Sequence, residues 1–383
     1  MSYVLIKGFF HVVGQSPDGD SIKFSAENPT LWEKIETDHR AIFEKNLAET
    51  DMKTGVSGVV NLRFQGIDAL ETHYTPSTPP PPSGINPIGG TALKKPIASR
   101  YAQPHVLGKA ATSCLLALIG VKQARWHRFG FIDQISVKDG RKLKELGMEA
   151  EFKEDLPGHI IVRDVERRGR PIAWVFAGTT RTRDGSQISK MQLRSRLARS
   201  LNYQLLEKGL VYPYFYMTLP SLFRKELIDA TSKAIKEANG LANNARLRNA
   251  ALRESRRAAK MQGLPLPEKL PNVWIYDQTL RGLKVRRLDD LVDKSEMWPY
   301  LFRKLLSAWH RDNTERYWQA VELGRQNEEI DWQLIDLDVF FQAGDAYVFT
   351  VSDRDFVRLS DVVEVTRGRL KMKIPPHEIV FLS

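Results

Sequence analysis

The sequence predicts an α+β protein of two domains, and three observations support this prediction. The chain has 383 residues, which is longer than one hydrophobic core usually organises. Short runs rich in β-branched and aromatic residues recur between segments whose apolar residues have helical spacing. Prolines cluster within residues 261–271, and the composition changes after them. We therefore expect a first domain over residues 1–260, a linker over 261–271 and a smaller α+β accessory domain over 272–383.

The N-terminal segments predict a hairpin, a helix and another strand. Residues 3–13 and 21–25 have strand composition and flank an Asp-Gly turn, which is a hairpin signal. Residues 30–48 carry apolar side chains near helical spacing, and residues 57–67 alternate as a strand does. The proline- and glycine-rich stretch 73–99 is typical of an exposed loop, which could be a spacer or a lid over a nearby site.

The rest of the chain continues this mixture of helices and strands. We expect helices over 104–119, 189–209 and 222–260, strand-like runs over 125–137 and 158–178, a Trp-rich helical region over 295–325 and a β-rich end over 334–383.

The positive charge of the chain is concentrated in one window. The formal net charge is +11, and residues 181–260 alone hold seventeen Lys and Arg against six Asp and Glu. A solvated helical face is the simplest interpretation, but such a face repels itself without a counter-charge. Phosphates would supply that charge, so we expect DNA or RNA as the partner. The candidate nucleic-acid-binding arginines are Arg194, Arg196, Arg253, Arg256 and Arg257.

An anionic membrane surface is the less favoured partner. The basic segment 243–260 lacks the large apolar anchors of interfacial helices. No apolar run approaches the roughly 20 residues that span a bilayer, and the N-terminus does not have the pattern of a signal peptide. The single cysteine, Cys114, excludes an internal disulfide. We therefore expect a cytoplasmic protein with no membrane partner.

Two acidic turns are the first candidates for chemistry. Asp20 ends the turn Asp18-Gly19-Asp20, and Asp68 follows the 57–67 strand. Ca²⁺ prefers carboxylate and carbonyl oxygens as ligands, and turns at strand ends can bring such groups together. Each aspartate alone is more often a turn former, so the pair by itself does not define a metal site.

Two arginines and a glutamate favour phosphate chemistry. Arg63 lies on the polar face of its strand, while Arg170 precedes an apolar strand. Guanidinium groups bind phosphate oxygens and stabilise a charge-rich transition state. Glu71 could accept a proton from water or position that water. A surface ion pair is the alternative for Arg63.

These residues occur in a family-like order. The chain contains the Asp18-Gly19-Asp20 turn, an Arg-x4-Asp-x2-Glu pattern from Arg63 to Glu71, and Gly169-Arg170 before an apolar strand. The ordered set resembles the staphylococcal nuclease (thermonuclease) family over roughly residues 3–240. The resemblance implies an OB-like five-stranded β-barrel with flanking helices. It also implies a calcium-dependent nuclease that cleaves DNA and RNA with little sequence preference and leaves 3′-phosphate ends.

The resemblance implies a role for each candidate. Asp20, Asp68 and the backbone carbonyl of Ala69 would hold Ca²⁺ or another divalent cation. Arg63 and Arg170 would bind the scissile phosphate and stabilise the transition state.

The resemblance makes Glu71 the candidate general base. It also assigns Tyr214 and Tyr216 to packing on a nucleotide base, which any aromatic face can do. Core packing of the segment 212–216 is an equal alternative.

The chain departs from the family in two ways. Ala69-Leu70 stands where the family usually has Thr-Pro, so a hydroxyl contact is lost. Insertions at about 26–55, 73–99 and 134–157 could narrow the substrate range or regulate access.

Other functions have less support in the sequence. The eight histidines show no zinc spacing, and there is no Walker loop or Gly-x-Gly-x-x-Gly turn. A non-catalytic nucleic-acid-binding module on the same OB-like fold is the alternative function. The C-terminal domain could bind a protein partner.

Overall fold

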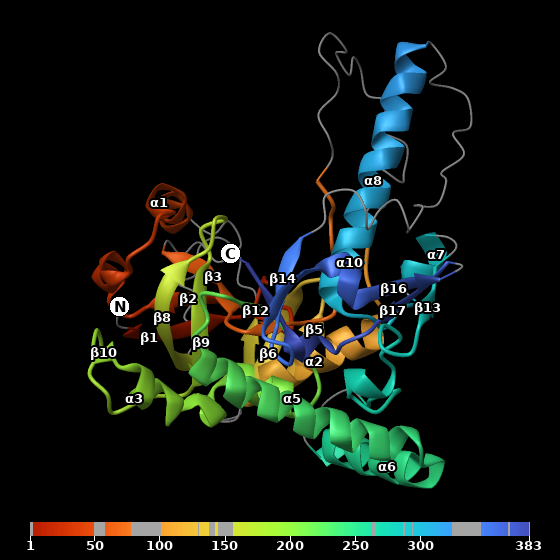
Figure 1. The fold of residues 1–383 in the computed structure, drawn as a ribbon. Helices are drawn as coiled ribbons and strands as arrows, with labels where there is room; N and C mark the ends of the chain where they lie inside the picture. Colours follow the sequence, from red (N-terminus) through yellow and green to blue (C-terminus); the bar gives the residue numbers. More distant parts are fainter. Residues whose placement is uncertain are drawn as a thin grey trace. The chain divides into compact units, whose positions relative to one another are not determined.

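The computed structural model describes residues 3–49, 58–77, 101–128, 130–137, 142–144, 156–261, 266–285, 288–292, 294–323, 346–366 and 368–382. The chain divides into two units (Figure 1). The first comprises Met1–Ala69 and Lys109–Ile275, and the second comprises Leu70–Gly108 and Tyr276–Ser383. This division differs from the expected boundary at 261–271, because residues 70–108 group with the C-terminal residues.

A closed five-stranded β-barrel lies at the centre of the first unit (Figure 1). Its strands, in spatial order, are β1 (Tyr3–His11), β2 (Ser21–Ala26), β3 (Val59–Phe64), β9 (Pro171–Ala177) and β8 (Pro157–Val165). Pairing of β8 with β1 closes the barrel, β3 and β9 are parallel, and the other barrel pairs are antiparallel. The expected α+β class is confirmed, and the barrel is consistent with an OB-like architecture.

The alternation of the strands explains the barrel core. Leu62 and Phe64 of β3 are buried, whereas Arg63 between them is partly exposed. Phe10 of β1 and Phe24 of β2 are fully buried and pack with their ring centroids 5.6 Å apart. Burial of each such side chain contributes about 1.5–3 kcal/mol.

Helices flank the barrel in the first unit. Helix α2 (His105–Leu118) lies in the chain between β3 and β8. Helix α5 (Ser221–Ala242) buries Phe223, whose ring lies 5.7 Å from Trp174 and 6.0 Å from Tyr3. A three-stranded sheet contains β5 (Val121–Trp126), β6 (Ile132–Val137) and β7 (Lys142–Lys144), and four short strands are β4 (Ile67–Asp68), β10 (Gln187–Ile188), β11 (Tyr212–Pro213) and β12 (Phe215–Tyr216).

Three predicted helices, over 30–48, 189–209 and 222–260, are interrupted, and in the last two a polar side chain caps the new helix. Ser200 begins a new helix by accepting a hydrogen bond from the Tyr203 N–H. Asn244 likewise accepts from the Leu247 N–H and separates the two halves of the predicted 222–260 helix. The resulting helices are η1 (Pro29–Lys34), α1 (Arg40–Ala48), α3 (Lys190–Arg194), η2 (Leu197–Arg199), α4 (Leu201–Glu207), α5 and α6 (Ala245–Met261).

The second unit contains the long helix α8 (Pro299–Glu322), several shorter helices and two small sheets. Trp298, Trp309 and Trp318 are buried in it. One sheet contains β13 (Leu283–Lys284), β17 (Arg369–Met372) and β16 (Val363–Thr366), and the other includes β14 (Tyr347–Thr350), β15 (Asp355–Arg358) and β18 (Ile379–Phe381). The helices of the second unit are α7 (Leu288–Leu291), α8 (Pro299–Glu322), α10 (Leu359–Val362) and η4 (Pro376–Glu378), and η3 (Val273–Ile275) ends the first unit.

Parts of the expected insertions lie outside the described residues. These parts are residues 50–55, 78–99, 138–141 and 145–155, so the expected loop over 73–99 is described only to residue 77. Residues 334–345 of the expected β-rich end also lie outside. Within the described part of the chain, no helix combines the length and apolar character needed to cross a membrane.

Candidate functional site

Asp20 is held in a tight turn at the start of β2. The Asp18 carboxylate accepts from the Gly19 N–H at 2.8 Å, and the Asp18 N–H donates to the Ser21 carbonyl at 3.2 Å. A Cβ at Gly19 would lie 2.7 Å from the Cβ of Ala111 and 2.9 Å from that of Ala69. Glycine is therefore required for the turn to pack closely. Asp20 itself is 7% exposed.

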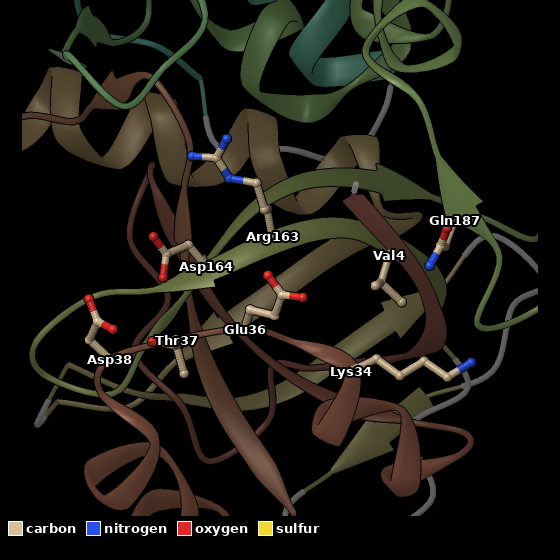
Figure 2. A pocket seen from close by; sticks show the side chains of 8 residues that line it. All are labelled: Val4, Lys34, Glu36, Thr37, Asp38, Arg163, Asp164 and Gln187. Atoms are coloured by element: carbon tan, nitrogen blue, oxygen red, sulfur yellow. The ribbon is translucent and has the colours of Figure 1, made fainter. Parts of the chain in front are cut away.

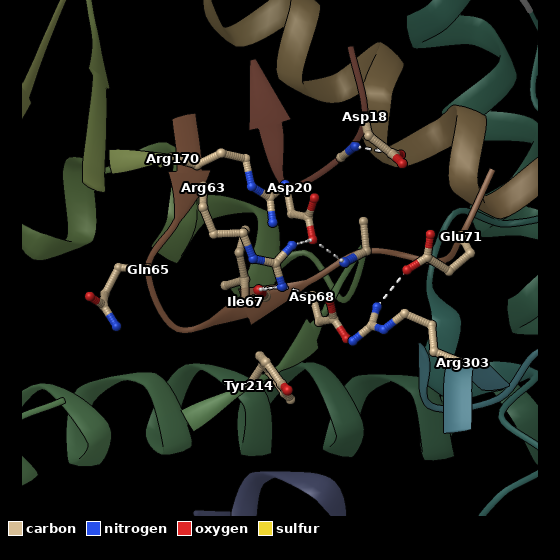
Figure 3. Close-up of polar contacts among 12 residues, drawn as sticks. Asp18, Asp20, Arg63, Gln65, Ile67, Asp68, Glu71, Arg170, Tyr214 and Arg303 are labelled. Carbon is tan, nitrogen blue, oxygen red and sulfur yellow. Dashed lines mark hydrogen bonds and ion pairs between the residues drawn. The ribbon is translucent and has the colours of Figure 1, made fainter. Parts of the chain in front are cut away.

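Arg63 joins the two aspartates. Its Nη1 pairs with Asp20 Oδ2, and its Nη2 donates to Asp68 Oδ1 at 2.8 Å (Figure 3). Asp68 is completely buried on β4, and the Arg63 side chain is 16% exposed. Asp20 Oδ2 also accepts from the Ala69 N–H at 3.1 Å. The structure thus brings Asp20 of the Asp18-Gly19-Asp20 turn together with Arg63, Asp68 and Ala69 of the Arg-x4-Asp-x2-Glu pattern.

Arg170 directly precedes the neighbouring strand, β9. Because β3 and β9 are parallel, with Arg63 opposite Ile172, Arg170 stands just before the point where the two strands pair. Its side chain extends beside that of Arg63 (Figure 3). Arg170 Nε pairs with the Glu166 carboxylate within the β8–β9 turn, and both side chains are about one quarter exposed.

The aromatic segment 212–216 has side chains both in the core and at the surface. Tyr212 and Phe215 are fully buried, so core packing accounts for them. Tyr214 and Tyr216 are partly exposed, and the Tyr216 hydroxyl donates to the Tyr214 hydroxyl at 3.0 Å. The guanidinium carbon of Arg63 lies 5.9 Å from the Tyr214 ring centroid, within the range of a cation–π contact. The structure therefore places Tyr214 at the Arg63 cluster.

Glu71 belongs to the second unit. Its carboxylate Oε1 accepts a hydrogen bond of 2.5 Å from Arg303 Nη1 on α8 (Figure 3). The two side chains are 18% and 22% exposed. Arg303 was not predicted from the sequence, because it lies 232 residues after Glu71 and belongs to no local motif.

The predicted nucleic-acid-binding arginines lie on two elements and differ in their contacts. Arg194, at the end of α3, pairs with Glu226 at 2.7 Å, while Arg196 is partly buried. Arg256 of α6 is exposed, but it donates to the Pro267 carbonyl at 2.8 Å and so also anchors the chain after the helix. Arg253 and Arg257 are exposed on α6.

Hard oxygen donors for a cation are present in the cluster. The carboxylates of Asp20 and Asp68 share Arg63, so a cation would have to replace that positive charge. In the described part of the chain, no group of three or more His, Cys, Asp or Glu residues is placed to hold a metal. The donor set is therefore two carboxylates, which backbone carbonyls would have to complete.

A separate pocket of about 650 Å³ lies elsewhere on the first unit (Figure 2). Three carboxylates, from Glu36, Asp38 and Asp164, line it together with the basic side chains of Lys34 and Arg163. The mixture of charges defines no single ligand chemistry, and none of the predicted site residues lines the pocket.

No protein-family model matches the chain, and no curated protein matches it.

Proposed function

We propose that this chain is a metal-dependent nuclease of the staphylococcal nuclease-like type, acting on DNA, RNA or both. The observation that carries the proposal is the sharing of Arg63 by the carboxylates of Asp20 and Asp68, with the ring of Tyr214 against the same guanidinium. A phosphate group, a cation and a base are the three ligands that such a cluster suits.

The donor chemistry fits a hard divalent cation. Asp20, Asp68 and the carbonyl of Ala69 are the residues that would hold Ca²⁺. Both carboxylates are at least nine-tenths buried and already balance one positive charge, so a cation can take the place of the guanidinium. Bound Ca²⁺ would supply charge that stabilises the developing negative charge on the phosphate.

Two arginines would recognise the scissile phosphate. Phosphate oxygens would accept from Arg63 and Arg170 in place of the carboxylates of Asp20 and Glu166 that hold them now. This exchange keeps every arginine paired with an anion. It also leaves the Asp20 carboxylate to the cation.

Glu71 is the candidate general base. It would take a proton from water while the water oxygen bonds to phosphorus. The bond from phosphorus to the 5′-oxygen would break, and that oxygen would take a proton from solvent. Glu71 follows Asp68 by three residues, so their Cα atoms cannot be more than about 10 Å apart.

A non-catalytic nucleic-acid-binding module is the second candidate. Arg63, Arg170 and Glu71 are each engaged by an oppositely charged side chain, and this arrangement suits a charge-balanced binding surface as well. The local excess of basic residues over 181–260 supports nucleic acid in both cases.

A cleavage assay separates the two functions. Purified protein would be incubated with single- and double-stranded DNA and RNA in Ca²⁺, Mg²⁺ or EDTA. Alongside it, Asp20→Asn and Glu71→Gln would be compared with Asp229→Asn, a change at a carboxylate that is 60% exposed on α5. Metal-dependent cleavage that only the first two variants lose supports the nuclease. Salt-sensitive binding without cleavage supports the binding module.

A further inference from the structure

The segment that carries Glu71 is bound to α8 by its side chains. The Glu71 carboxylate pairs with Arg303, and the Tyr74 hydroxyl lies 2.6 Å from the Ser307 Oγ. Arg303 and Ser307 are four residues apart and share one face of the helix. The Tyr74 ring also packs edge-on against Phe302, with the centroids 6.4 Å apart. One face of α8 therefore holds both ends of the segment 71–74.

The main chain of Glu71 is fixed through a buried glutamine. Gln103 is 0% exposed, and its side-chain carbonyl accepts from the Glu71 N–H at 3.1 Å. The Gln103 N–H in turn donates to the Glu71 carbonyl at 2.7 Å. Its side-chain amide donates to the carbonyls of Met297 at 2.8 Å and Ser295 at 3.3 Å, just before α8. The backbone and the carboxylate of Glu71 thus depend on the same C-terminal region.

We propose that Arg303 is a positioning residue that holds the Glu71 carboxylate in its working orientation. This inference rests on the proposed nuclease function, in which Glu71 is the general base. A charge-assisted hydrogen bond between partly buried side chains is strong enough to select one rotamer of a flexible glutamate.

Kinetics of full-length variants test the role. Arg303→Met should lower kcat by about 10- to 100-fold with KM changed by less than about twofold, because misorienting a base affects the chemical step more than binding. Arg303→Lys should recover part of the loss, since it keeps a charged donor. Arg311→Met, at an arginine on α8 whose side chain is 59% exposed, is the matched control and should cleave as the wild type does. In a Glu71→Gln background, Arg303→Met should cause no further loss.

Two results would overturn the role of Arg303 while leaving the nuclease intact. One is a wild-type kcat in Arg303→Met. The other is a loss of kcat on Arg303→Met that is as large in the Glu71→Gln background as in the wild type. An inactive wild type would instead remove the nuclease itself, and the catalytic role of Arg303 with it.

The pairing has a test that needs no activity. Unfolding of Arg303→Met, Glu71→Gln and the double variant forms a double-mutant cycle. The double variant should lose less stability than the two single losses combined, and strictly additive losses would overturn the pairing.

Discussion

The Arg63 guanidinium donates a 2.8 Å hydrogen bond to the carboxylate of Asp68, and that carboxylate is completely buried. Asp68 lies on β4 opposite Tyr212 of β11. Arg63 therefore contributes a compensating positive charge to a carboxylate that solvent does not reach.

Removing the guanidinium should destabilise the protein. Arg63→Met leaves the Asp68 charge buried without this partner, so the free energy of unfolding should fall by roughly 3–5 kcal/mol. Urea denaturation at neutral pH measures the change. Lys225→Met is the control, because it removes a pair with Asp229 whose side chains are 72% and 60% exposed and should cost less than about 1 kcal/mol. Equal losses in the two variants would contradict the buried-pair interpretation.

Calcium should stabilise the folded chain through Asp20 and Asp68. A ligand that binds only the native state adds about 2.7 kcal/mol at a concentration 100 times its Kd, so Ca²⁺ should raise Tm. Asp20→Asn should lose most of this rise, whereas Asp229→Asn should keep it. Calorimetry with and without EDTA measures both, and an undiminished rise in Asp20→Asn would place the cation elsewhere.

Tyr214 should contribute to binding of single-stranded nucleic acid. Stacking of one base on an aromatic ring is worth about 1–3 kcal/mol, so Tyr214→Ala should weaken affinity by roughly 5- to 150-fold. Fluorescence anisotropy with a labelled oligonucleotide measures it. Tyr347→Ala removes a tyrosine that is 52% exposed on β14 and should bind as the wild type does. An unchanged affinity in Tyr214→Ala would show that the Tyr214 ring has a packing role alone.

The exposed arginines of α6 should act through phosphate contacts. Replacing Arg253 and Arg257 with Gln should reduce the slope of log affinity against log salt by about 1 for each lost contact, with little effect on sequence preference. Titrations at several salt concentrations measure the slope. Arg311→Gln on α8 is the control, and a slope unchanged by the α6 variant would assign the basic face to solubility.

His159 should make the fold sensitive to acid. Burial lowers the pKa of His159 below its ordinary value of 6.5, and the ring stacks on Phe176 with centroids 5.0 Å apart. The unfolded chain therefore binds a proton more readily, so stability should fall as pH drops below about 6.5 and be unaffected by this group above it. Unfolding at pH 7.5 and 5.5 measures the loss, which should be smaller in His159→Gln. The same loss in the variant would assign the sensitivity to other groups, such as the buried His310 and His377, whose pKa values burial also lowers.

Local patterns predicted most of the first unit. Alternation placed Leu62 and Phe64 in the core and Arg63 outside it, as the structure confirms. Helix interruptions were missed where a polar residue such as Ser200 or Asn244 caps a new helix. Such a residue is tolerated within a helical pattern as well, so periodicity alone does not reveal the break.

The candidate site was predicted as a set of residues and not as a set of contacts. Motif order selected Asp20, Arg63 and Asp68, and the structure joins all three. The expected division of the chain did not anticipate that residues 70–108 group with the C-terminal residues. The buried side chain of Gln103, for example, bonds to the carbonyls of Ser295 and Met297. Nothing in the sequence around Gln103 distinguishes it from an exposed polar residue.

The sequence by itself determined the α+β class, the strand alternation, the localised basic charge and the order of the acidic and basic motifs, because each depends on residues close together in the chain. Only the tertiary structure decided which charges meet. Closure of the barrel placed β9 beside β3 and Arg170 near Arg63, and packing of α8 brought Arg303 to Glu71 across 232 residues. Such pairings between distant residues depend on how the whole chain buries its apolar surface. A pattern of neighbouring residues does not contain this information.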